Sequence, residues 1–363
     1  RIYAIDPNGY EVPTKSYVVT LGQLQHNAIL PAGFLREGDR IGLALQVEDY
    51  FTKAGRTLGL FSAEVWTENS GHFAFELDEI DFDDARYINT HHDHAYAQLS
   101  KKKFQKLFKT RNNPLTIYPY EGTGTFDLNA QDSLQFSIML RDVNGNETQH
   151  QLWVKNPHPK SAAKIAYTSA THWLPTEAYS YQTGPWQLQI DSFTFFEPVR
   201  KSLDLAAKRI GSSQLQLAKP IALSYQLKDS INAHRYFITM NGTALPTTFK
   251  EGKLFSSSKT LGTFGLRMDE IAPTIQNQSN NKLDTLNNGA WSWFVKDDFS
   301  GVASYTCWQN GKWVPAYYDA KNKVIKAQFQ VPFVAGTILE IRVKDAAGNV
   351  RVLQSSTPLA PFK

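Results

Sequence analysis

The chain has 363 residues, of which 42% are hydrophobic and 13% aromatic, and its formal net charge is +4. This composition excludes a disordered chain, and the length exceeds that of one compact core, so two or three domains are expected. Lysines cluster between residues 101 and 109, but no basic stripe with interleaved aromatic residues runs along the chain. Nucleic acid is therefore not an expected partner.

The sequence also limits disulfides and membrane insertion. Its single cysteine, Cys307, excludes an intrachain disulfide. No run approaches the ~18 apolar residues of a spanning helix, so no membrane-spanning segment is expected. The chain begins at Arg1 without a methionine or a signal-like segment, so we expect a trimmed product with something missing upstream.

Alternation of apolar and polar residues with a period of two dominates the chain. Strict alternation predicts antiparallel strands with one face inward and the other in water. The strands are short and lie between clusters of Gly, Asn, Asp and Pro, which favours β-sandwiches over α/β units. The clearest alternating runs are at residues 41–47, 134–140, 221–227 and 339–343.

An acidic, histidine-rich turn at residues 81–96 interrupts this pattern and leads into the one helix that the sequence predicts, at residues 93–108. Apolar residues recur there at roughly helical spacing, with lysines mostly opposite. Asp83 and Asp84 favour a turn start through capping and the helix dipole. The sequence Asn-Asn-Pro at 112–114 is expected to stop the helix.

Two segments, at residues 142–146 and 345–349, share the form Asp-x-x-Gly-Asn between apolar strands. The aspartate can accept hydrogen bonds from amides ahead of it and the glycine supplies a positive φ, so each reverses the chain into a closing strand. With a linker at 157–159 and a seam at 269–275, they predict a mostly β protein of three tandem antiparallel β-sandwich (immunoglobulin-like) domains. The predicted domains are 1–156, with a helical insert at about 82–111, then 157–271 and 272–363.

His91 and His94 are candidate metal ligands. In a helix they would stand at i and i+3 on one face and could chelate zinc. A catalytic site also needs a third ligand, and no distant partner is evident in the sequence. Histidine beside acidic residues at a helix start is commonly a hydrogen-bonding brace, which is the preferred interpretation.

Arg86 lies in the same turn as several carboxylates. A guanidinium can hold a carboxylate through two parallel bonds, which predicts a local ion-pair network. A grip on a ligand carboxylate is the alternative. The residues expected to form this structural turn are Asp81, Asp83, Asp84, Arg86 and Asn89.

Several aromatic residues resemble the stacking platforms that bind sugars, although core packing is the default. Trp291 and Trp293 alternate with other residues and are expected to fill the third core, whereas Tyr317 and Tyr318 are adjacent, so one must face outward. The candidate contact aromatics, for a glycan or a protein, are Trp173, Tyr179, Trp186, Trp313 and Tyr317.

The sequence offers no support for nucleophilic catalysis. It contains no Gly-x-Ser-x-Gly elbow, and Cys307 lies in a strand-like run where a buried, inert thiol is expected.

Residues 81–118 combine a Phe-Asp turn, the sequence Arg-Tyr-Ile-Asn at 86–89, an aspartate and an aromatic residue, the predicted lysine-rich helix, and Asn-x-Leu-x-Ile-Tyr at 113–118. This region resembles the part that follows the catalytic domain in lysostaphin-like (LytM-type) zinc peptidoglycan endopeptidases of Bacteroidota. More loosely, the seam around Asp269 and the third domain, with its turn at Asp345, are similar to the rest of that β-rich tail.

The sequence departs from the catalytic pattern of that family, in which zinc is held by a His-x-x-x-Asp pair and a later His-x-His. This chain has His-x-His only at 92–94, and no histidine is followed four residues later by aspartate. At a helix start, side chains at i and i+2 diverge by about 200°. No catalytic residue is therefore carried over, no cofactor is expected in this chain, and zinc would belong to a peptidase domain that lies upstream of Arg1 or has been lost.

The resemblance implies a non-catalytic scaffold or binding region of the periplasm or cell envelope. It would position the endopeptidase on peptidoglycan or on an envelope assembly, so the expected partners are peptidoglycan or envelope proteins. The alternative is a structural interaction subunit of a secretion or outer-membrane machine without hydrolytic activity. A small metal-dependent enzyme using His91 and His94 is a third possibility, and whether the full-length protein is a metallopeptidase stays open.

Overall fold

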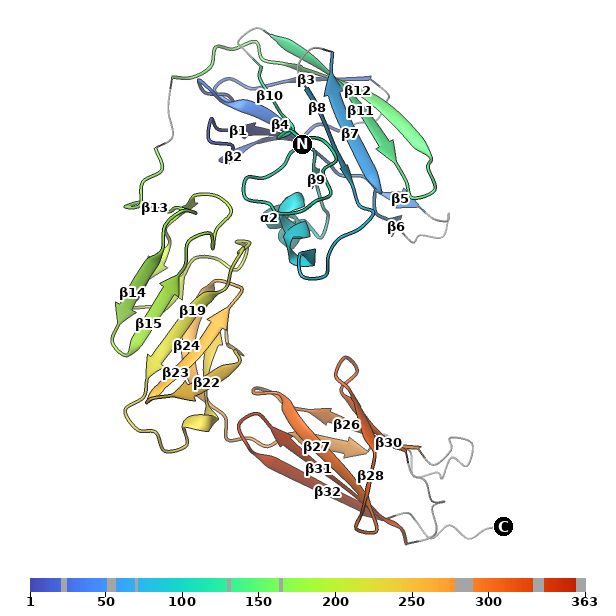
Figure 1. Ribbon diagram of the computed structural model, residues 1–363, viewed down its shortest axis with the longest axis vertical. Helices are drawn as coiled ribbons and strands as arrows, with labels where there is room; N and C mark the ends of the chain where they lie inside the picture. The colour runs from blue at the N-terminus through green and yellow to red at the C-terminus, as the bar shows by residue number, and fades with distance from the viewer. Residues whose placement is uncertain are drawn as a thin grey trace.

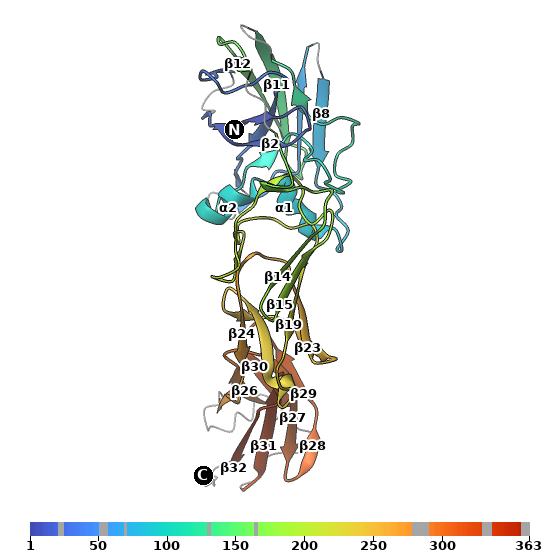
Figure 2. The same cartoon turned by 90° about the vertical axis from the view of Figure 1, so that its left-hand side faces the viewer.

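The computed structural model describes residues 1–20, 25–50, 57–68, 71–128, 132–162, 166–277, 290–328 and 336–356. It is mostly β, with 48% strand and 6% helix, and contains three tandem β-sandwich domains as the alternation predicts. In Figure 1 the domains follow one another along an open arc, and Figure 2 shows the same chain edge-on as a narrow column. Among the described residues, no helix has the length and apolar character needed to cross a membrane.

The first domain packs two five-stranded sheets around a core that includes Phe73, Phe126 and Phe136. Pairing is antiparallel except between β12 and β3, which run parallel. The first sheet consists of β1 (Ile2–Ile5), β2 (Glu11–Tyr17), β4 (Arg40–Leu45), β9 (Gln105–Lys106) and β10 (Thr125–Phe126). The second consists of β3 (Gln25–Ile29), β7 (Ser62–Thr67), β8 (Gly71–Glu76), β11 (Ser133–Arg141) and β12 (Glu147–Lys155), and β5 (Asp49–Tyr50) pairs with β6 (Thr57–Leu58).

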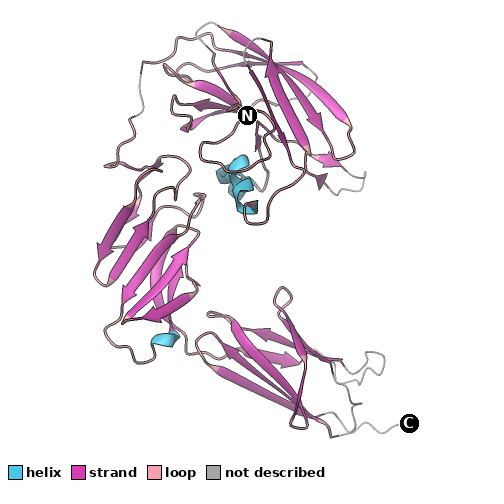
Figure 3. Cartoon of the chain, viewed as in Figure 1, coloured by secondary structure: helices cyan, strands magenta, loops and turns pink. Residues whose placement is uncertain are grey.

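The helical part of the insert is shorter than the sequence predicts (Figure 3). It comprises a 3-10 turn, η1 (Ala85–Tyr87), and two short helices, α1 (Ile88–His91) and α2 (His94–Ser100). The predicted helix at 93–108 is therefore wrong in its second half. Asp93 begins α2 by accepting a bond from the Tyr96 amide, and Lys101 ends it with a left-handed backbone, φ 62°.

Beyond Lys101 the apolar residues of the insert serve the sheet instead of a helix. β9 pairs with β4, and Phe104 and Phe108 form a second, small core with Tyr3, on the outer side of the first sheet. Gly42 permits this contact, since a Cβ there would lie 2.6 Å from the Phe108 ring. β4 is consequently buried on both faces, not on one face as its alternation predicts.

The second domain packs two further sheets around Trp173, Trp186 and Phe264. One sheet has the order β14-β15-β19-β23-β22 and the other β17-β18-β24-β20-β21, while β13 pairs with β16. Their bounds are β13 (His172–Trp173), β14 (Tyr179–Thr183), β15 (Trp186–Ile190), β16 (Val199–Arg200), β17 (Leu203–Asp204), β18 (Arg209–Ile210), β19 (Ile221–Gln226), η2 (Ala233–Arg235), β20 (Tyr236–Met240), β21 (Thr243–Ala244), β22 (Thr247–Lys250), β23 (Lys253–Ser258) and β24 (Gly262–Met268).

The third domain packs two four-stranded sheets, β25-β26-β30-β29 and β28-β27-β31-β32. Trp291 and Trp293 lie in its core, as expected, and so does the Cys307 thiol, whose pKa burial raises to about 12. The bounds are β25 (Thr274–Asn277), β26 (Ala290–Lys296), β27 (Val302–Gln309), β28 (Lys312–Val314), β29 (Ala316–Asp319), β30 (Val324–Gln328), β31 (Ile338–Asp345) and β32 (Val350–Ser356).

The two Asp-x-x-Gly-Asn turns form as predicted. Asp142 Oδ1 accepts bonds from the amides of Asn144 and Asn146, between β11 and β12. Asp345 Oδ1 likewise accepts from the Asn349 amide at 2.7 Å, between β31 and β32. The glycine of each turn has a positive φ, 84° and 92°. The same local chemistry therefore closes the first and third domains.

Candidate functional site

The insert turn contacts the second domain instead of bracing itself through ion pairs. Arg86 Nη2 donates to the carbonyl oxygens of Leu217, at 2.9 Å, and Ala218. Within the described residues Arg86 forms no ion pair, so the predicted network with Asp81, Asp83 and Asp84 is wrong. Asp81 has a local role in the turn, because its Oδ1 accepts a hydrogen bond from the Asp83 amide. Asp84 directly precedes η1 but makes no capping hydrogen bond with its side chain. Asn89 lies in α1.

The histidines of the insert occupy different surroundings. His91 is fully buried, with its ring 4.4 Å from that of Phe75 and its Nδ1 3.3 Å from the Tyr118 hydroxyl. Burial lowers the pKa of His91 well below its usual value and that of His92 to about 4. His91 is thus a neutral ring within the core, whereas His94 is the half-buried first residue of α2.

The described residues contain one group of three metal-type side chains with ligand atoms within 4.8 Å of one another, and it does not include His91 or His94. It consists of Asp269, Asp297 and Asp345, where the second and third domains meet. Carboxylates suit hard cations such as Ca²⁺, which takes about six to eight oxygens. Here all three already accept protein N–H donors, for example from Ser300 to Asp269 and from Gly301 to Asp297. The closeness of the three carboxylates is therefore explained by these hydrogen bonds within the joint.

The five candidate contact aromatics divide into core and surface residues. Trp173 and Trp186 are 0% and 3% exposed, so their assignment as contact residues is wrong. Tyr179 is half-buried, and its hydroxyl accepts a bond from the Leu174 amide. Trp313 and Tyr317 are 64% and 67% exposed and remain available for contacts.

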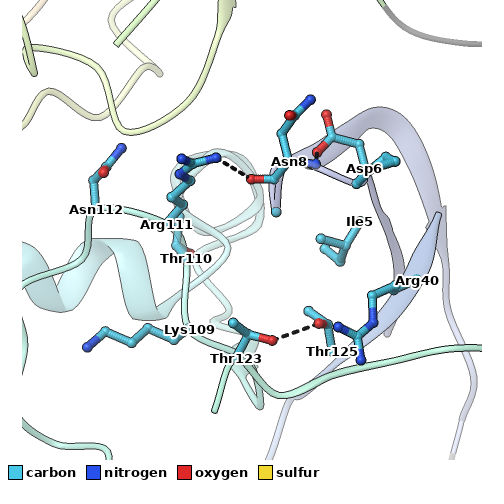
Figure 4. A pocket seen from close by; sticks show the side chains of 12 residues that line it. Ile5, Asp6, Asn8, Arg40, Lys109, Thr110, Arg111, Asn112, Thr123 and Thr125 are labelled. Atoms are coloured by element: carbon cyan, nitrogen blue, oxygen red, sulfur yellow. Dashed lines mark hydrogen bonds between the residues drawn. The ribbon is translucent and has the colours of Figure 1, made fainter. Parts of the chain in front are cut away.

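A pocket of about 380 Å³ opens on the first domain (Figure 4). Arg40, from β4, and Arg111 lie on opposite sides of it, with Thr123 and Thr125 between them. Arg111 Nη1 donates to the Asn8 carbonyl oxygen at 2.7 Å, which holds its guanidinium at the rim. The pocket therefore presents guanidinium and hydroxyl donors, which suit a small carboxylate-bearing or hydroxylated ligand.

The joint between the first and second domains contains a charge cluster around the buried Lys106, in which Glu11 and Glu197 are half-buried. Lys106 Nζ forms an ion pair with Glu11, and Glu197, from the second domain, lies beside both. Burial raises the pKa of Glu197 to about 8, Glu11 adds to this and Lys106 opposes it. Burial alone would lower the pKa of Lys106, but the two glutamates raise it above its usual value. Asp6, Tyr10 and Tyr167 also interact electrostatically with Glu197.

Around this cluster the two domains interlock through further contacts. Asn112 Nδ2 donates to the Phe196 carbonyl oxygen at 3.2 Å, and the rings of Tyr87 and Phe196 meet edge to face at 5.9 Å. With Arg86, these residues connect the insert of the first domain to the loops of the second. No local pattern in the sequence predicts this role, because the partners of these residues lie far away along the chain.

The joint between the second and third domains depends on hydrogen bonds from side chains to backbone carbonyls and on contacts of Phe237 and Arg267 with the Phe299 ring. Asn349 Nδ2 donates to the Asp269 carbonyl oxygen at 3.3 Å, and Arg351 Nε to that of Pro273 at 3.4 Å. The Arg267 guanidinium lies 4.0 Å from the centre of the Phe299 ring. The sequence predicts a domain boundary at Asp269, but it does not predict the residues that Asp269 contacts there.

No protein-family model and no curated protein matches the chain. Among solved structures, it aligns with extracellular cadherin domains 1–4 of protocadherin gamma B7, at 9% identity and a TM-score of 0.20, over 93% of this chain and 75% of that one. It also aligns with SGBP-B of the Bacteroides ovatus mixed-linkage glucan utilization locus, at 9% identity and 0.15, over 93% and 66%. A third match is a Ca²⁺-stabilized ice-binding adhesin of an Antarctic bacterium, at 9% and 0.19, over 88% and 68%. These similarities support no statement about function.

Proposed function

We propose that this chain is the non-catalytic scaffold and binding region of a cell-envelope protein. It positions a lysostaphin-like zinc peptidoglycan endopeptidase on peptidoglycan or on an envelope assembly in the periplasm. The proposal takes its family from the resemblance at residues 81–118. The structural observation that carries it is the pair of joints, which connect three sandwiches end to end through specific side-chain contacts.

Such joints suit a spacer that holds a partner domain at a set distance from its attachment point. Arg86 and Asn112 fix the first domain to the second through carbonyl oxygens, and Asn349 does the same for the third. Hydrogen bonds to backbone groups have a defined direction, so they favour one relative orientation of the domains. The pocket between Arg40 and Arg111 adds a place where carboxylates of peptidoglycan could bind.

Sedimentation with purified peptidoglycan sacculi tests the binding function. We expect the chain to appear in the pellet in a saturable manner, and the double variant Arg40→Ala/Arg111→Ala to bind more weakly. An exposed basic pair away from the pocket, Lys259→Ala/Lys321→Ala, serves as the charge-matched control. A chain that stays in the supernatant at all sacculus concentrations contradicts the proposal.

The non-catalytic assignment has its own test. The chain is incubated with sacculi and zinc, and the soluble fraction is analysed by chromatography for muropeptides. We expect none above the background of sacculi alone. Release of muropeptides in proportion to the amount of chain would replace the scaffold with an enzyme.

A second candidate function is a structural interaction subunit of an envelope machine without hydrolytic activity. It is favoured by Trp313 and Tyr317, which lie exposed on the neighbouring edge strands β28 and β29. Exposed aromatics at sheet edges are typical of protein contact sites. Capture from native envelopes, compared between wild type and Trp313→Ala/Tyr317→Ala, tests it, since a partner held through these rings is lost only in the variant.

A further inference from the structure

One face of the second domain combines hydrogen-bonding groups with an almost complete lack of charge. It is the outer face of the sheet β14-β15-β19-β23-β22, a sheet that lies on the left of Figure 1 at mid-height. Residues paired across antiparallel strands place their side chains on the same face, so the register defines its members. All are half-buried or exposed, whereas the opposite face contains Trp186, Leu188 and Leu223 of the core. They are Ser180, Gln182, Gln187, Gln189, Ala222, Ser224, Gln226, Thr248, Lys250, Lys253, Phe255 and Ser257.

The chemistry of this face is that of amides and hydroxyls. It contains no carboxylate, and its two cations, Lys250 and Lys253, are paired with each other in the register at one end. Within the described part of the chain, the side-chain amides of Gln182, Gln187 and Gln189 make no hydrogen bond. Each amide offers two donors and an acceptor, so the three side chains are open to a ligand whose groups both donate and accept.

A single row of the register crosses all five strands. It contains Gln182, Gln187, Ser224, Phe255 and Thr248, one from each strand in spatial order. With strands about 4.8 Å apart, this row extends for about 19 Å. The Phe255 ring is 41% exposed in the row, which gives an extended ligand one flat apolar surface among polar groups.

Two hollows lie along this row. One, of about 430 Å³, is lined by Phe255, Gln187 and Gln189, and the small side chains of Ala222 and Ser257 leave its space open. The other, of about 440 Å³, shares Gln187 and Ser224 with the first. It also reaches Lys228 and Lys253, so the face passes from a neutral end to a basic end.

We propose that this face binds a glycan strand, namely the sugar backbone of peptidoglycan; this rests on the proposed function and identifies the surface that performs it. Phe255 stacks against the apolar side of a pyranose ring, and the free amides of the glutamines bond hydroxyl and acetamido groups. The lysine end accommodates the carboxylates that the strand carries. A neutral face with a basic end fits this ligand better than an acidic or apolar protein surface.

The test measures binding of the full chain to peptide-free glycan strands, prepared by amidase treatment of sacculi, and to chitohexaose as a neutral probe. The informative variants are Phe255→Ala and Gln187→Ala. Phe249→Ala is the matched control, because Phe249 has the same 41% exposure in the neighbouring strand but pairs with Leu254, on the opposite side of the sheet. We expect Phe255→Ala to weaken binding about tenfold, and Phe249→Ala to leave it unchanged.

The outcomes separate this proposal from the scaffold function. If the wild type binds sacculi but neither glycan strands nor chitohexaose, the face does not bind glycan and the scaffold function stands. The same conclusion follows if Phe255→Ala and Phe249→Ala bind the strands equally well. Binding to glycan strands that Phe255→Ala weakens and Phe249→Ala does not supports the proposal, whereas a wild type that binds neither sacculi nor strands overturns both.

Discussion

The two joints of this molecule use different chemistry. The joint between the first and second domains contains the buried Lys106, which forms an ion pair with Glu11, and the nearby Glu197. The joint between the second and third domains instead places carboxylates against backbone N–H donors, as Asp269 and Asp345 do. Buried ion pairs are sensitive to the loss of one partner and to protonation, while bonds to backbone donors depend mainly on local geometry. The first joint should therefore respond to charge and pH, and the second to the shape of its turns.

Removal of the central cation should have the largest effect. Lys106→Ala leaves Glu11 in the joint without its ion-pair partner, and we expect a loss of about 3 kcal/mol in the free energy of unfolding. Urea unfolding, monitored by tryptophan fluorescence, measures it. Lys103→Ala, at an exposed position of the same insert, should change stability by less than about 0.5 kcal/mol. Equal stabilities of the two variants would show that the cluster does not support the joint.

The Asp-x-x-Gly-Asn turns provide an internal comparison for the second joint. Asp345 is 1% exposed and bonds both the amide and the side chain of Asn349, whereas Asp142 lies in an exposed turn. Asp345→Ala leaves the half-buried Asn349 amide without its acceptor and removes one of the two bonds of the Asn349 side chain, so we expect a loss of about 2 kcal/mol in the third domain. Asp142→Ala should lower the free energy of unfolding of the first domain by about 1 kcal/mol or less. Calorimetry that resolves the domain transitions makes the comparison, and a reversed order would contradict it.

The pH dependence of the first joint should depend on Glu197. Its pKa rises from 4.5 to about 8 on folding, so between these pH values the unfolded state loses the proton that the folded state keeps. Stability of the wild type therefore falls as the pH rises from about 4.5 to about 8, and changes little from this cause above that. Within this window, each rise of one pH unit lowers the free energy of unfolding by up to about 1.4 kcal/mol.

Glu197→Gln removes this titration. Its stability relative to wild type should increase from pH 5 to pH 8 and then level off, in urea unfolding at constant ionic strength. Glu251→Gln, at an exposed turn of the same domain, should follow the wild-type profile. A constant difference between Glu197→Gln and wild type at all pH values would show that Glu197 keeps its ordinary protonation in the joint.

Loss of the Arg86 contact should have the smallest effect on stability. Arg86→Ala removes donors to two carbonyl oxygens at the surface of the joint, which we expect to cost about 1 kcal/mol. Its clearer consequence is a wider range of domain orientations, seen as a broader distance distribution in small-angle X-ray scattering. Arg200→Ala, an exposed arginine of the second domain, is the control, and identical scattering from both variants would show that Arg86 does not hold the joint.

The strands and their turns could be predicted from the sequence, because both depend on neighbouring residues. The alternating runs at 134–140, 221–227 and 339–343 form strands β11, β19 and β31, and the two Asp-x-x-Gly-Asn segments form the turns expected of them. Trp291, Trp293 and Cys307 are buried where their alternation places them. In each case the side-chain direction follows from a period of two along one strand.

The insert shows why the rest could not be predicted. Phe104 and Phe108 fit a helical spacing, but the chain forms strand β9 there, and both rings are buried against the outer side of β4. A short helix is only marginally stable by itself, so the contacts with the sheet decide the local structure. Arg86 sits among three aspartates, yet its partners lie 131 and 132 residues further along the chain. Neither the pocket beside Arg40 nor the polar face around Phe255 has a local signal, since each is assembled from several strands.

By itself, the sequence determined the β class, the closing turns and the inward tryptophans, because period, glycine and aspartate act over a few residues. Only the tertiary structure decided which charges meet at the joints, that His91 is a core ring, and which glutamines share one face. Those depend on strand register and on domain contacts between distant segments, where burial and electrostatics act through space and not along the chain.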